Sequence, residues 1–342
     1  MSIAIEALSK TFGGRAAVDG LTFDIPSNAL FAVVGPSGCG KSTLLRLIAG
    51  LETPDRGRIA LDGAEVAGPG IFVPPEERRV GVVFQSYALW PHLTVAANVA
   101  FPYEAQGVAR AETARKVAEH LNTVSLEAFA GRRPEALSGG QRQRVALARC
   151  LAGAARTILM DEPLANLDPH LRGAMESELR AFHERSGVTT LYITHDQREA
   201  MALADLMAVM EAGAIQQIGT PQEIYERPQT EMVARFVGRG SLIPAEVAGG
   251  HARIAGHSVP VSGGRAGGGE GQATVFVRPR DIVVDGEGWP VEIVSAHYRG
   301  GGWEAQAQSD GLAAHIMLDL DRPVRAGETL RIALKSGWVL PN

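Results

Sequence analysis

The sequence predicts an α/β domain that contains a helical insertion and is followed by a small all-β domain. Over roughly the first 235 residues, short β-rich runs alternate with longer amphipathic stretches, the pattern of a sheet covered by helices. Between Pro91 and Arg149 β-rich runs are scarce, and beyond Gly238 helical periodicity disappears. We therefore place the α/β domain at 1–237, its helical insertion at about 89–155, and the all-β domain at 238–342.

In the α/β domain the predicted strands are short runs rich in branched and apolar residues. In chain order they are Ile3–Ala7, Leu30–Val34, Gly81–Gln85, Thr157–Asp161, Thr189–Thr194 and Leu206–Glu211. A helix begins near Lys41, where an apolar run follows a glycine-rich stretch, and two more cover Ala111–Leu121 and Gln141–Leu151.

In the all-β domain the predicted strands are separated by turn-like clusters, which indicates a small barrel or sandwich. They are Ala252–Ile254, Ala273–Val277, Ile282–Val284, Val291–Ala296, Trp303–Ala307, His315–Leu318 and Thr329–Leu334.

Composition excludes several classes of protein. The formal net charge of −5 does not favour nucleic acid as a partner, and the second domain lacks a basic stripe with interleaved aromatic residues. The N-terminus lacks the pattern of a signal peptide, and no run approaches the roughly 20 apolar residues of a membrane helix. We expect a soluble cytosolic chain whose two cysteines neither pair nor bind metal.

One contiguous stretch fits the phosphate-binding pattern G-x-x-x-x-G-K-[ST]. Its residues are Gly35, Pro36, Ser37, Gly38, Cys39, Gly40, Lys41, Ser42 and Thr43. Glycines let the backbone N–H groups converge on one anion, and the following helix adds its positive N-terminal end. Lys41 would reach the outer phosphates, and the hydroxyl of Ser42 would bind Mg²⁺. The stretch therefore predicts a site for a nucleoside triphosphate.

Two carboxylates follow the apolar run Thr157–Met160. A buried parallel strand delivers its last residues to the edge of the sheet where ligands bind. Asp161 can hold Mg²⁺ there, and Glu162 can accept a proton from an attacking water. Such a run ending in Asp-Glu is common by itself, and the phosphate loop is what favours the catalytic interpretation.

A second anion-binding helix start is predicted at Ser138, Gly139, Gly140 and Gln141. With the following Gln143–Arg149, this segment resembles the signature of the ATP-binding-cassette (ABC) ATPases. Further positions match that family in order. Phe12 resembles its adenine-stacking aromatic residue, Gln85 its Q-loop glutamine, Asp168 its D-loop aspartate and His195 its switch histidine.

The resemblance implies a P-loop NTPase that hydrolyses ATP with Mg²⁺ between two copies of itself. ATP bound at Lys41 of one copy is closed by Ser138 and Gly140 of the other. Gln85 would contact the magnesium or the attacking water, and His195 would sense the γ-phosphate. The chain departs from the family at Phe12, where tyrosine is frequent, and at Ala165, where serine is frequent, so hydroxyl contacts at both are in doubt.

Other segments resemble the ATPases of bacterial importers. They are Ser86–Leu93, Gly219–Tyr225 and Val277–Asp281. The resemblance implies separate membrane permeases that contact the Gln85–Leu93 region, and a periplasmic or extracellular solute-binding protein that acts indirectly. It also implies a peripheral location on the cytoplasmic side of the inner membrane and an oligonucleotide-binding-like (TOBE-type) barrel at the C-terminus.

The sequence leaves the transported solute open. Gly238–Pro244 and the short second domain most resemble the ferric-iron, polyamine and phosphonate branch, which favours ferric iron. The alternatives are polyamine, 2-aminoethylphosphonate, sulfate or sugar. A soluble ABC ATPase acting on DNA or ribosomes is a more distant alternative, because the chain has one phosphate loop and no heptad run. The barrel could also sense a small molecule.

Overall fold

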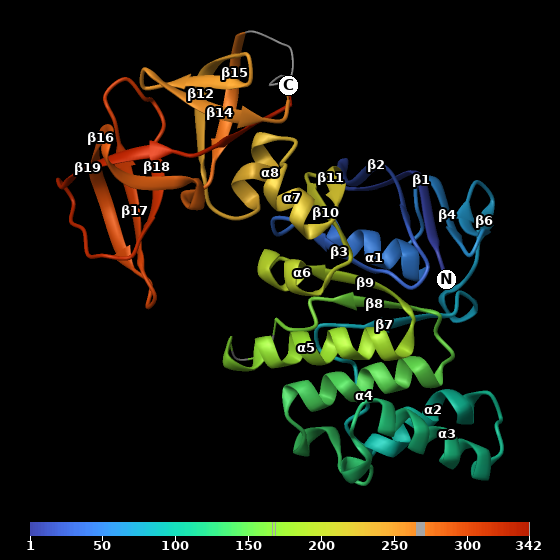
Figure 1. Cartoon of the computed structure of the whole chain (residues 1–342). Coiled ribbons are helices and arrows are strands. Elements are labelled where there is room, and N and C mark those ends of the chain that lie inside the picture. The colour runs from blue at the N-terminus through green and yellow to red at the C-terminus, as the bar shows by residue number, and fades with distance from the viewer. Residues whose placement is uncertain (166, 168, 265–270, 342) are drawn as a thin grey trace. The chain divides into compact units, whose positions relative to one another are not determined.

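A computed structural model describes residues 1–165, 167, 169–264 and 271–341 (Figure 1). The chain divides into two compact units, Met1–Pro221 and Gln222–Asn342. The predicted α/β domain with a helical insertion and the predicted all-β C-terminal domain are both confirmed. No helix among these described residues is long and apolar enough to cross a membrane.

A six-stranded sheet forms the centre of the first unit. In spatial order it contains β11 (Ala214–Gly219), β10 (Leu206–Glu211), β3 (Leu30–Val34), β9 (Thr189–Thr194), β8 (Thr157–Asp161) and β7 (Val80–Val83). The strands from β10 to β7 run parallel, and β11 is antiparallel at the edge. Every residue of β3 and β9 is buried, because helices and a second sheet cover both faces.

The second sheet of this unit is antiparallel. Its order is β2 (Arg15–Ile25), β1 (Ile3–Phe12), β4 (Arg56–Leu61), β5 (Ala64–Gly68) and β6 (Ile71–Phe72). Helix α1 (Lys41–Ala49) contributes its leucines to one apolar cluster that includes residues of both sheets. The sequence prediction found only the first half of β1 here.

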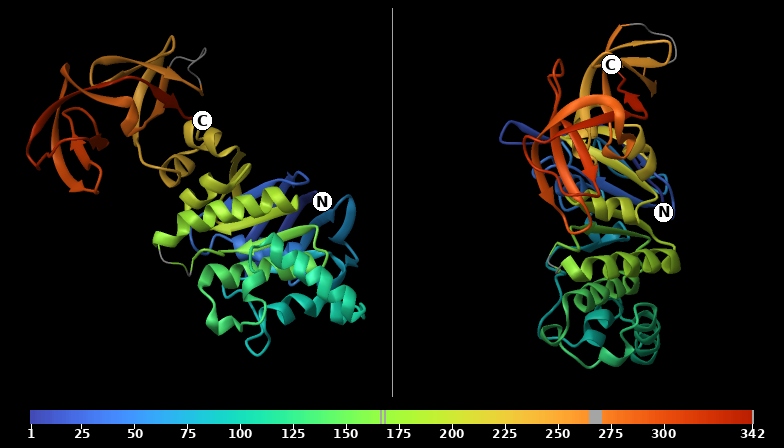
Figure 2. Two further views of the ribbon diagram at one scale, coloured as in Figure 1. Left: turned by 60° about the horizontal axis from the view of Figure 1, so that its bottom comes forward. Right: turned by 60° about the vertical axis from the view of Figure 1, so that its left-hand side comes forward.

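Three packed helices form the insertion. They are α2 (Val95–Ala105), α3 (Arg110–Thr123) and α4 (Gly139–Ala152), green to teal in Figures 1 and 2. Short 3₁₀ turns lie at Pro75–Glu77, Glu127–Phe129 and Pro134–Ala136. Helix α2 was not predicted, because its mostly apolar sequence has no clear helical period and carries Pro102.

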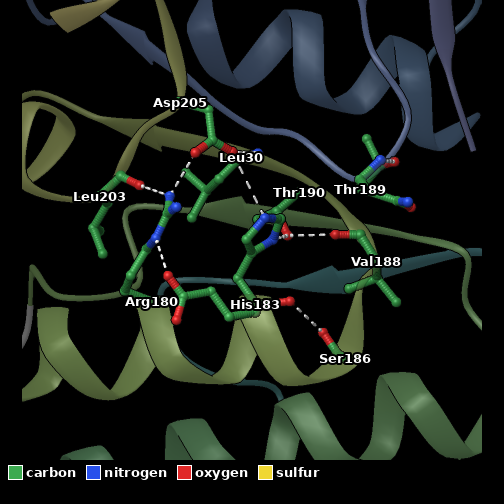
Figure 3. Close-up of polar contacts among 11 residues, drawn as sticks. Leu30, Arg180, His183, Ser186, Val188, Thr189, Thr190, Leu203 and Asp205 are labelled. Atoms are coloured by element: carbon green, nitrogen blue, oxygen red, sulfur yellow. Dashed lines mark hydrogen bonds and ion pairs between the residues drawn. The ribbon is translucent and has the colours of Figure 1, made fainter.

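Helices α5 (Pro169–Ser186) and α6 (Gln197–Leu203) complete the unit. A polar cluster joins α5 to the central sheet (Figure 3). Arg180 Nη1 donates to Asp205 Oδ1 at 2.7 Å, and the same carboxylate accepts the backbone N–H of Leu30. The buried imidazole of His183 lies 3.1 Å from Thr190 Oγ1. Each buried polar group is thereby satisfied at the point where helix and sheet meet.

The second unit begins with α7 (Pro221–Glu226) and α8 (Glu231–Phe236). A closed barrel follows, in the order β12 (Ser241–Ala248), β13 (His251–Ile254), β14 (His257–Ser262), β20 (Gly337–Val339) and β15 (Gly271–Val277). A four-stranded sheet contains β18 (Ile316–Leu320), β17 (Trp303–Gln308), β16 (Ile282–Tyr298) and β19 (Thr329–Leu334), and a 3₁₀ turn covers Pro279–Asp281. One apolar cluster spans barrel and sheet.

One feature of this unit differs from the prediction. The runs Ile282–Val284 and Val291–Ala296 belong to the single strand β16, whose register shifts between Val284 and Trp289. The two compact units divide at Pro221/Gln222, while the domain boundary at 237/238 stays a prediction. N-terminal to that predicted boundary, α8 packs on the barrel through Ala234, and the indole N–H of Trp338 donates to Pro228 O at 2.9 Å.

Candidate nucleotide site

The predicted phosphate loop connects β3 to α1. Gly40 precedes the helix with φ of 108°, and a Cβ there would lie 1.9 Å from the carbonyl oxygen of Ala17. Only glycine fits this position, for both backbone and steric reasons. No side chain caps α1, so its first N–H groups remain available to a ligand.

A cavity of about 230 Å³ opens on this loop. It is lined by Ala17, Ser37, Gly38, Gly40, Lys41, Ser42, Thr43 and Glu162. The loop residues Gly35, Pro36 and Cys39 do not line it. Ala17 was missed by the sequence analysis, because its position depends on how β2 packs against the loop and no local motif marks it.

Lys41 is buried, with 6% of its surface exposed. Its ammonium group donates to Gly35 O at 2.8 Å and Pro36 O at 3.0 Å, and it lies 3.8 Å from Cys39 Sγ. These partners are neutral, and a buried cation is stabilised far better by an anion. The lysine is therefore placed to bind phosphate.

Ser42 lines the cavity and contacts Asp161, which does not line it. Ser42 Oγ donates to Asp161 Oδ1 at 3.0 Å, although the two residues come from α1 and β8. Burial raises the pKa of the Asp161 carboxyl, and the hydrogen bond from Ser42 opposes that effect. A hydroxyl and a carboxylate are ligands that Mg²⁺ accepts together with phosphate oxygens, so the pair fits this ion.

Glu162 and His195 also come together. They follow the neighbouring parallel strands β8 and β9, and His195 Nδ1 lies 3.0 Å from Glu162 Oε1. Glu162 has φ of 47°, and its N–H donates to Ile193 O at 2.9 Å. A left-handed non-glycine residue is strained, and here the strain accompanies a carboxylate that faces the cavity.

Gln85 lies outside the cavity lining. Strand β7 ends at Val83, so the predicted strand Gly81–Gln85 was wrong at its end and Gln85 sits exposed in a turn. Two left-handed residues, Tyr87 and Ala88, shape this turn. Arg149 of α4 holds it by donating to Ala88 O at 2.6 Å.

The predicted second anion site starts α4. Ser138 and Gln141 form a capping box, in which Ser138 Oγ accepts the N–H of Gln141 and Gln141 Oε1 accepts that of Ser138. A Cβ on Gly139 would lie 2.5 Å from a Leu167 methyl group, and one on Gly140 would lie 2.5 Å from the Met175 sulfur. None of these four residues lines the cavity at Lys41, within the described part of the chain.

The last two residues predicted for the nucleotide site are Phe12 and Asp168. Phe12 ends β1 with 49% of its surface exposed, and Lys10 Nζ lies 5.2 Å from its ring centroid. The ring is thus open to stacking but does not line the cavity. Asp168 lies outside the described residues.

Comparison with known proteins gives consistent matches. The family model described as ABC transporter matches residues 18–165. The sulfate/thiosulfate import ATP-binding protein CysA of Caulobacter vibrioides is 44% identical over 304 residues, which cover 88% of this chain and 87% of that protein. Its namesake from Xanthomonas campestris is 39% identical over 348 residues, covering 100% of both chains. The Fe(3+) ions import ATP-binding protein FbpC of Rhizobium etli is 40% identical over 318 residues, covering 90% and 88%.

The chain also resembles a solved structure, a dimeric post-hydrolysis state of the ATP-binding cassette MJ0796 bound to ADP and Pi. The TM-score is 0.56 at 29% sequence identity, over 64% of this chain and 98% of the other.

Proposed function

Since the chain belongs to the family of ABC transporter ATP-binding proteins, we propose that it is the ATP-hydrolysing subunit of an ABC importer. The observation that carries this proposal is that the cavity lining brings together Lys41, Ser42 and Glu162, the last two with a polar partner each. Asp161 is the partner of Ser42, and His195 is the partner of Glu162. The names of the relatives, all import ATP-binding proteins, support coupling to uptake.

Each residue has a distinct role in the proposed hydrolysis. Lys41 exchanges its carbonyl partners for the outer phosphates of ATP, and the N–H groups of the loop bind the same anion. Ser42 and Asp161 would hold Mg²⁺, which would supply positive charge to the phosphate oxygens. Glu162 accepts a proton from the attacking water. The water oxygen then bonds to the γ-phosphorus, and the bond from that phosphorus to the β–γ bridging oxygen breaks.

His195 is proposed as the γ-phosphate sensor. It keeps Glu162 oriented through the 3.0 Å contact, and about half of its side chain is exposed. Gln85 completes the proposed site after the turn that carries it moves toward the nucleotide.

The site is proposed to be completed by a second copy. Ser138, Gly139, Gly140 and Gln141 offer an anion-binding helix start that this cavity does not use, and the similar cassette structure is described as dimeric. The second copy would also bring its Asp168 near the nucleotide, while Phe12 stacks on adenine. ATP then holds two copies together, and loss of the γ-phosphate releases them.

The Gln85–Leu93 region is proposed to contact the membrane permease. Trp90 packs on Phe101 with ring centroids 4.3 Å apart, and 43% of Phe101 remains exposed. The buried Asn98 accepts the N–H of Trp90 and donates to Leu93 O, which fixes the segment. This ordered, partly apolar surface suits a permease loop. We propose that the subunit lies on the cytoplasmic side of the membrane and is served indirectly by a solute-binding protein.

Ferric iron remains our candidate solute, with sulfate second. Relatives named for iron and for sulfate match nearly the whole chain at similar identity, and a spermidine/putrescine import protein of Acidothermus cellulolyticus matches 72% of it at 49%. Uptake of radiolabelled ferric iron and sulfate by cells with and without this gene decides between them. Loss of neither uptake would contradict both candidates.

The direct test of the proposed function is ATP hydrolysis by the purified protein and by Glu162→Gln. We expect turnover to fall at least about a hundredfold, because the general base is lost. ATP should hold the variant as a dimer. Glu119→Gln, which removes an exposed carboxylate from α3, should hydrolyse ATP normally. Full turnover in Glu162→Gln, or a monomer at saturating ATP, would mean that the base or the composite site is misassigned.

A further inference from the structure

A second polar cavity lies in the Gln222–Asn342 unit, where the end of α7 meets the barrel. Its volume is about 280 Å³. Cations and hydroxyls dominate the lining, which includes Arg227, Arg278, Arg280, Ser262, Ser336 and Trp338. None of these residues takes part in the proposed hydrolysis.

Arg278 is the buried cation of this cavity, with 4% of its surface exposed. Its guanidinium donates through Nε to Tyr225 O at 3.1 Å, through Nη2 to the same oxygen, and through Nη1 to Arg239 O at 3.1 Å. These bonds use three of its five N–H groups. No carboxylate oxygen among the described residues lies within 4.0 Å of its nitrogens, and burial lowers its pKa to about 10.

Aromatic rings cover the flat sides of this guanidinium. Its Cζ lies 3.6 Å from the ring centroid of Tyr225 and 4.7 Å from that of Phe276. Stacking of this kind leaves the edge of the guanidinium as its polar approach. One N–H group of Nη1 and one of Nη2 are left over from the three hydrogen bonds, and Arg278 lines the cavity. Charged N–H donors of this kind suit the oxygens of an oxyanion.

Two carboxylates also line the cavity, Glu226 and Asp281. Glu226 Oε1 is already engaged by Arg280 Nη2 at 3.5 Å. Arg278 forms no ion pair within 4.0 Å among the described residues, and Asp281 raises its pKa only from a greater distance, against the stronger effect of burial. An anion there removes the cost of burying the charge of Arg278.

We propose that this cavity binds a small tetrahedral oxyanion, such as sulfate or phosphate, between Arg227, Arg278 and Arg280. The serine hydroxyls of Ser262 and Ser336 supply further donors. Arg227 follows α7 directly, whereas Arg278 and Arg280 follow β15. The bound anion therefore bridges α7 and the barrel and stabilises their packing. The proposal is independent of ATP hydrolysis.

Calorimetric titration of the full-length protein with sodium sulfate tests the site. Saturating Mg²⁺ and ADP occupy the phosphate loop, and sodium chloride of equal ionic strength serves as the blank. We expect saturable binding that Arg280→Gln weakens at least about tenfold, because one charge-assisted partner is lost. Arg322→Gln should change it less than about twofold, since this arginine is similarly exposed and pairs with Glu328 outside the cavity.

A second readout is the thermal unfolding of the same three proteins. Sulfate should raise the melting temperature of wild type and Arg322→Gln more than that of Arg280→Gln, because only an occupied cavity fastens α7. Equal affinity in wild type and Arg280→Gln would overturn the proposal and indicate an adventitious ion only. So would the absence of saturable heat up to about 50 mM sulfate. An inactive ATPase with intact sulfate binding would refute the proposed function and leave this site standing.

Discussion

At the phosphate loop, the backbone geometry requires glycine at position 40. Gly40 combines a left-handed φ with a Cβ position 1.9 Å from a backbone carbonyl, whereas Gly38 is left-handed but faces open space. The two glycines of one motif therefore serve different purposes. Gly40 permits close packing against Ala17, and Gly38 permits only the turn.

Gly40→Ala should destabilise the first unit by about 3 kcal/mol or more, because the loop and its neighbour must separate. Gly38→Ala should cost about 1 kcal/mol from backbone conformation alone. Chemical denaturation of the nucleotide-free proteins measures the difference. Equal losses in the two variants would contradict the steric argument.

The buried His183 gives the first unit a pH-dependent stability (Figure 3). Burial lowers its pKa below the usual 6.5, opposed by the Asp205 carboxylate and assisted by Arg180. The folded state therefore binds a proton less readily than the unfolded chain. Stability from this group is complete above the ordinary pKa and is lost as the pH falls from about 6.5 toward the lower, folded pKa.

We expect His183→Gln to flatten the decline of the unfolding free energy between about pH 6.5 and pH 5. The control is His92→Gln, which changes an exposed histidine of the same unit and should leave the slope as in wild type. Denaturant titrations at several pH values measure both slopes. An unchanged slope in His183→Gln would show that other groups carry the acid sensitivity.

At the scale of elements, two helix N-caps make the same kind of hydrogen bond but have different proposed roles. Ser138 Oγ accepts the N–H of Gln141 at the start of α4, and Thr94 Oγ1 accepts the N–H of Ala97 at the start of α2. Both are structural caps of the insertion. Only Ser138 belongs to the predicted anion-binding segment.

Ser138→Ala and Thr94→Ala should each lower stability by about 1 kcal/mol, since each loses one capping hydrogen bond. ATP hydrolysis by the isolated protein should fall only in Ser138→Ala, because its hydroxyl also contacts the nucleotide of the second copy in the proposed dimer. Paired denaturation and turnover assays measure this. An equal loss of activity in the two variants would assign Ser138 to structure alone.

Sequence reasoning found the elements whose residues form a clear continuous pattern along the chain. Strands β8, β9 and β10 were predicted at both ends, because fully buried parallel strands are continuous apolar runs. Strands β2, β4 and β5 were missed, because one of their faces is exposed and polar residues interrupt the run. In β2 the alternation of Leu21, Phe23 and Ile25 is the signal that could have revealed it.

For the whole molecule, described residues of the second unit form two apolar clusters. One spans the barrel and the four-stranded sheet, and the other joins Ala234 of α8 to Phe276 and Leu340. A boundary at 237/238 would remove both α7 and α8 and expose Phe276 and Leu340. The contacts thus favour a domain that begins at Gln222.

A fragment of residues 222–342 should fold alone with cooperative unfolding. The shorter fragment 238–342 should melt at least about 5 °C lower, because it loses the α8 packing and the Trp338–Pro228 hydrogen bond. Circular dichroism during heating compares them. Identical melting temperatures would support the predicted domain boundary at 237/238.

The sequence by itself determined those features whose residues are neighbours in the chain. The phosphate loop, the Ser138 cap and the buried strands each lie within a short contiguous run, so composition and spacing predict them. Only the tertiary structure decided which distant residues meet. The Ser42–Asp161 and Glu162–His195 contacts depend on sheet order and strand register. The arginine cavity beside α7 depends on how two helices pack on a barrel, which no local periodicity encodes.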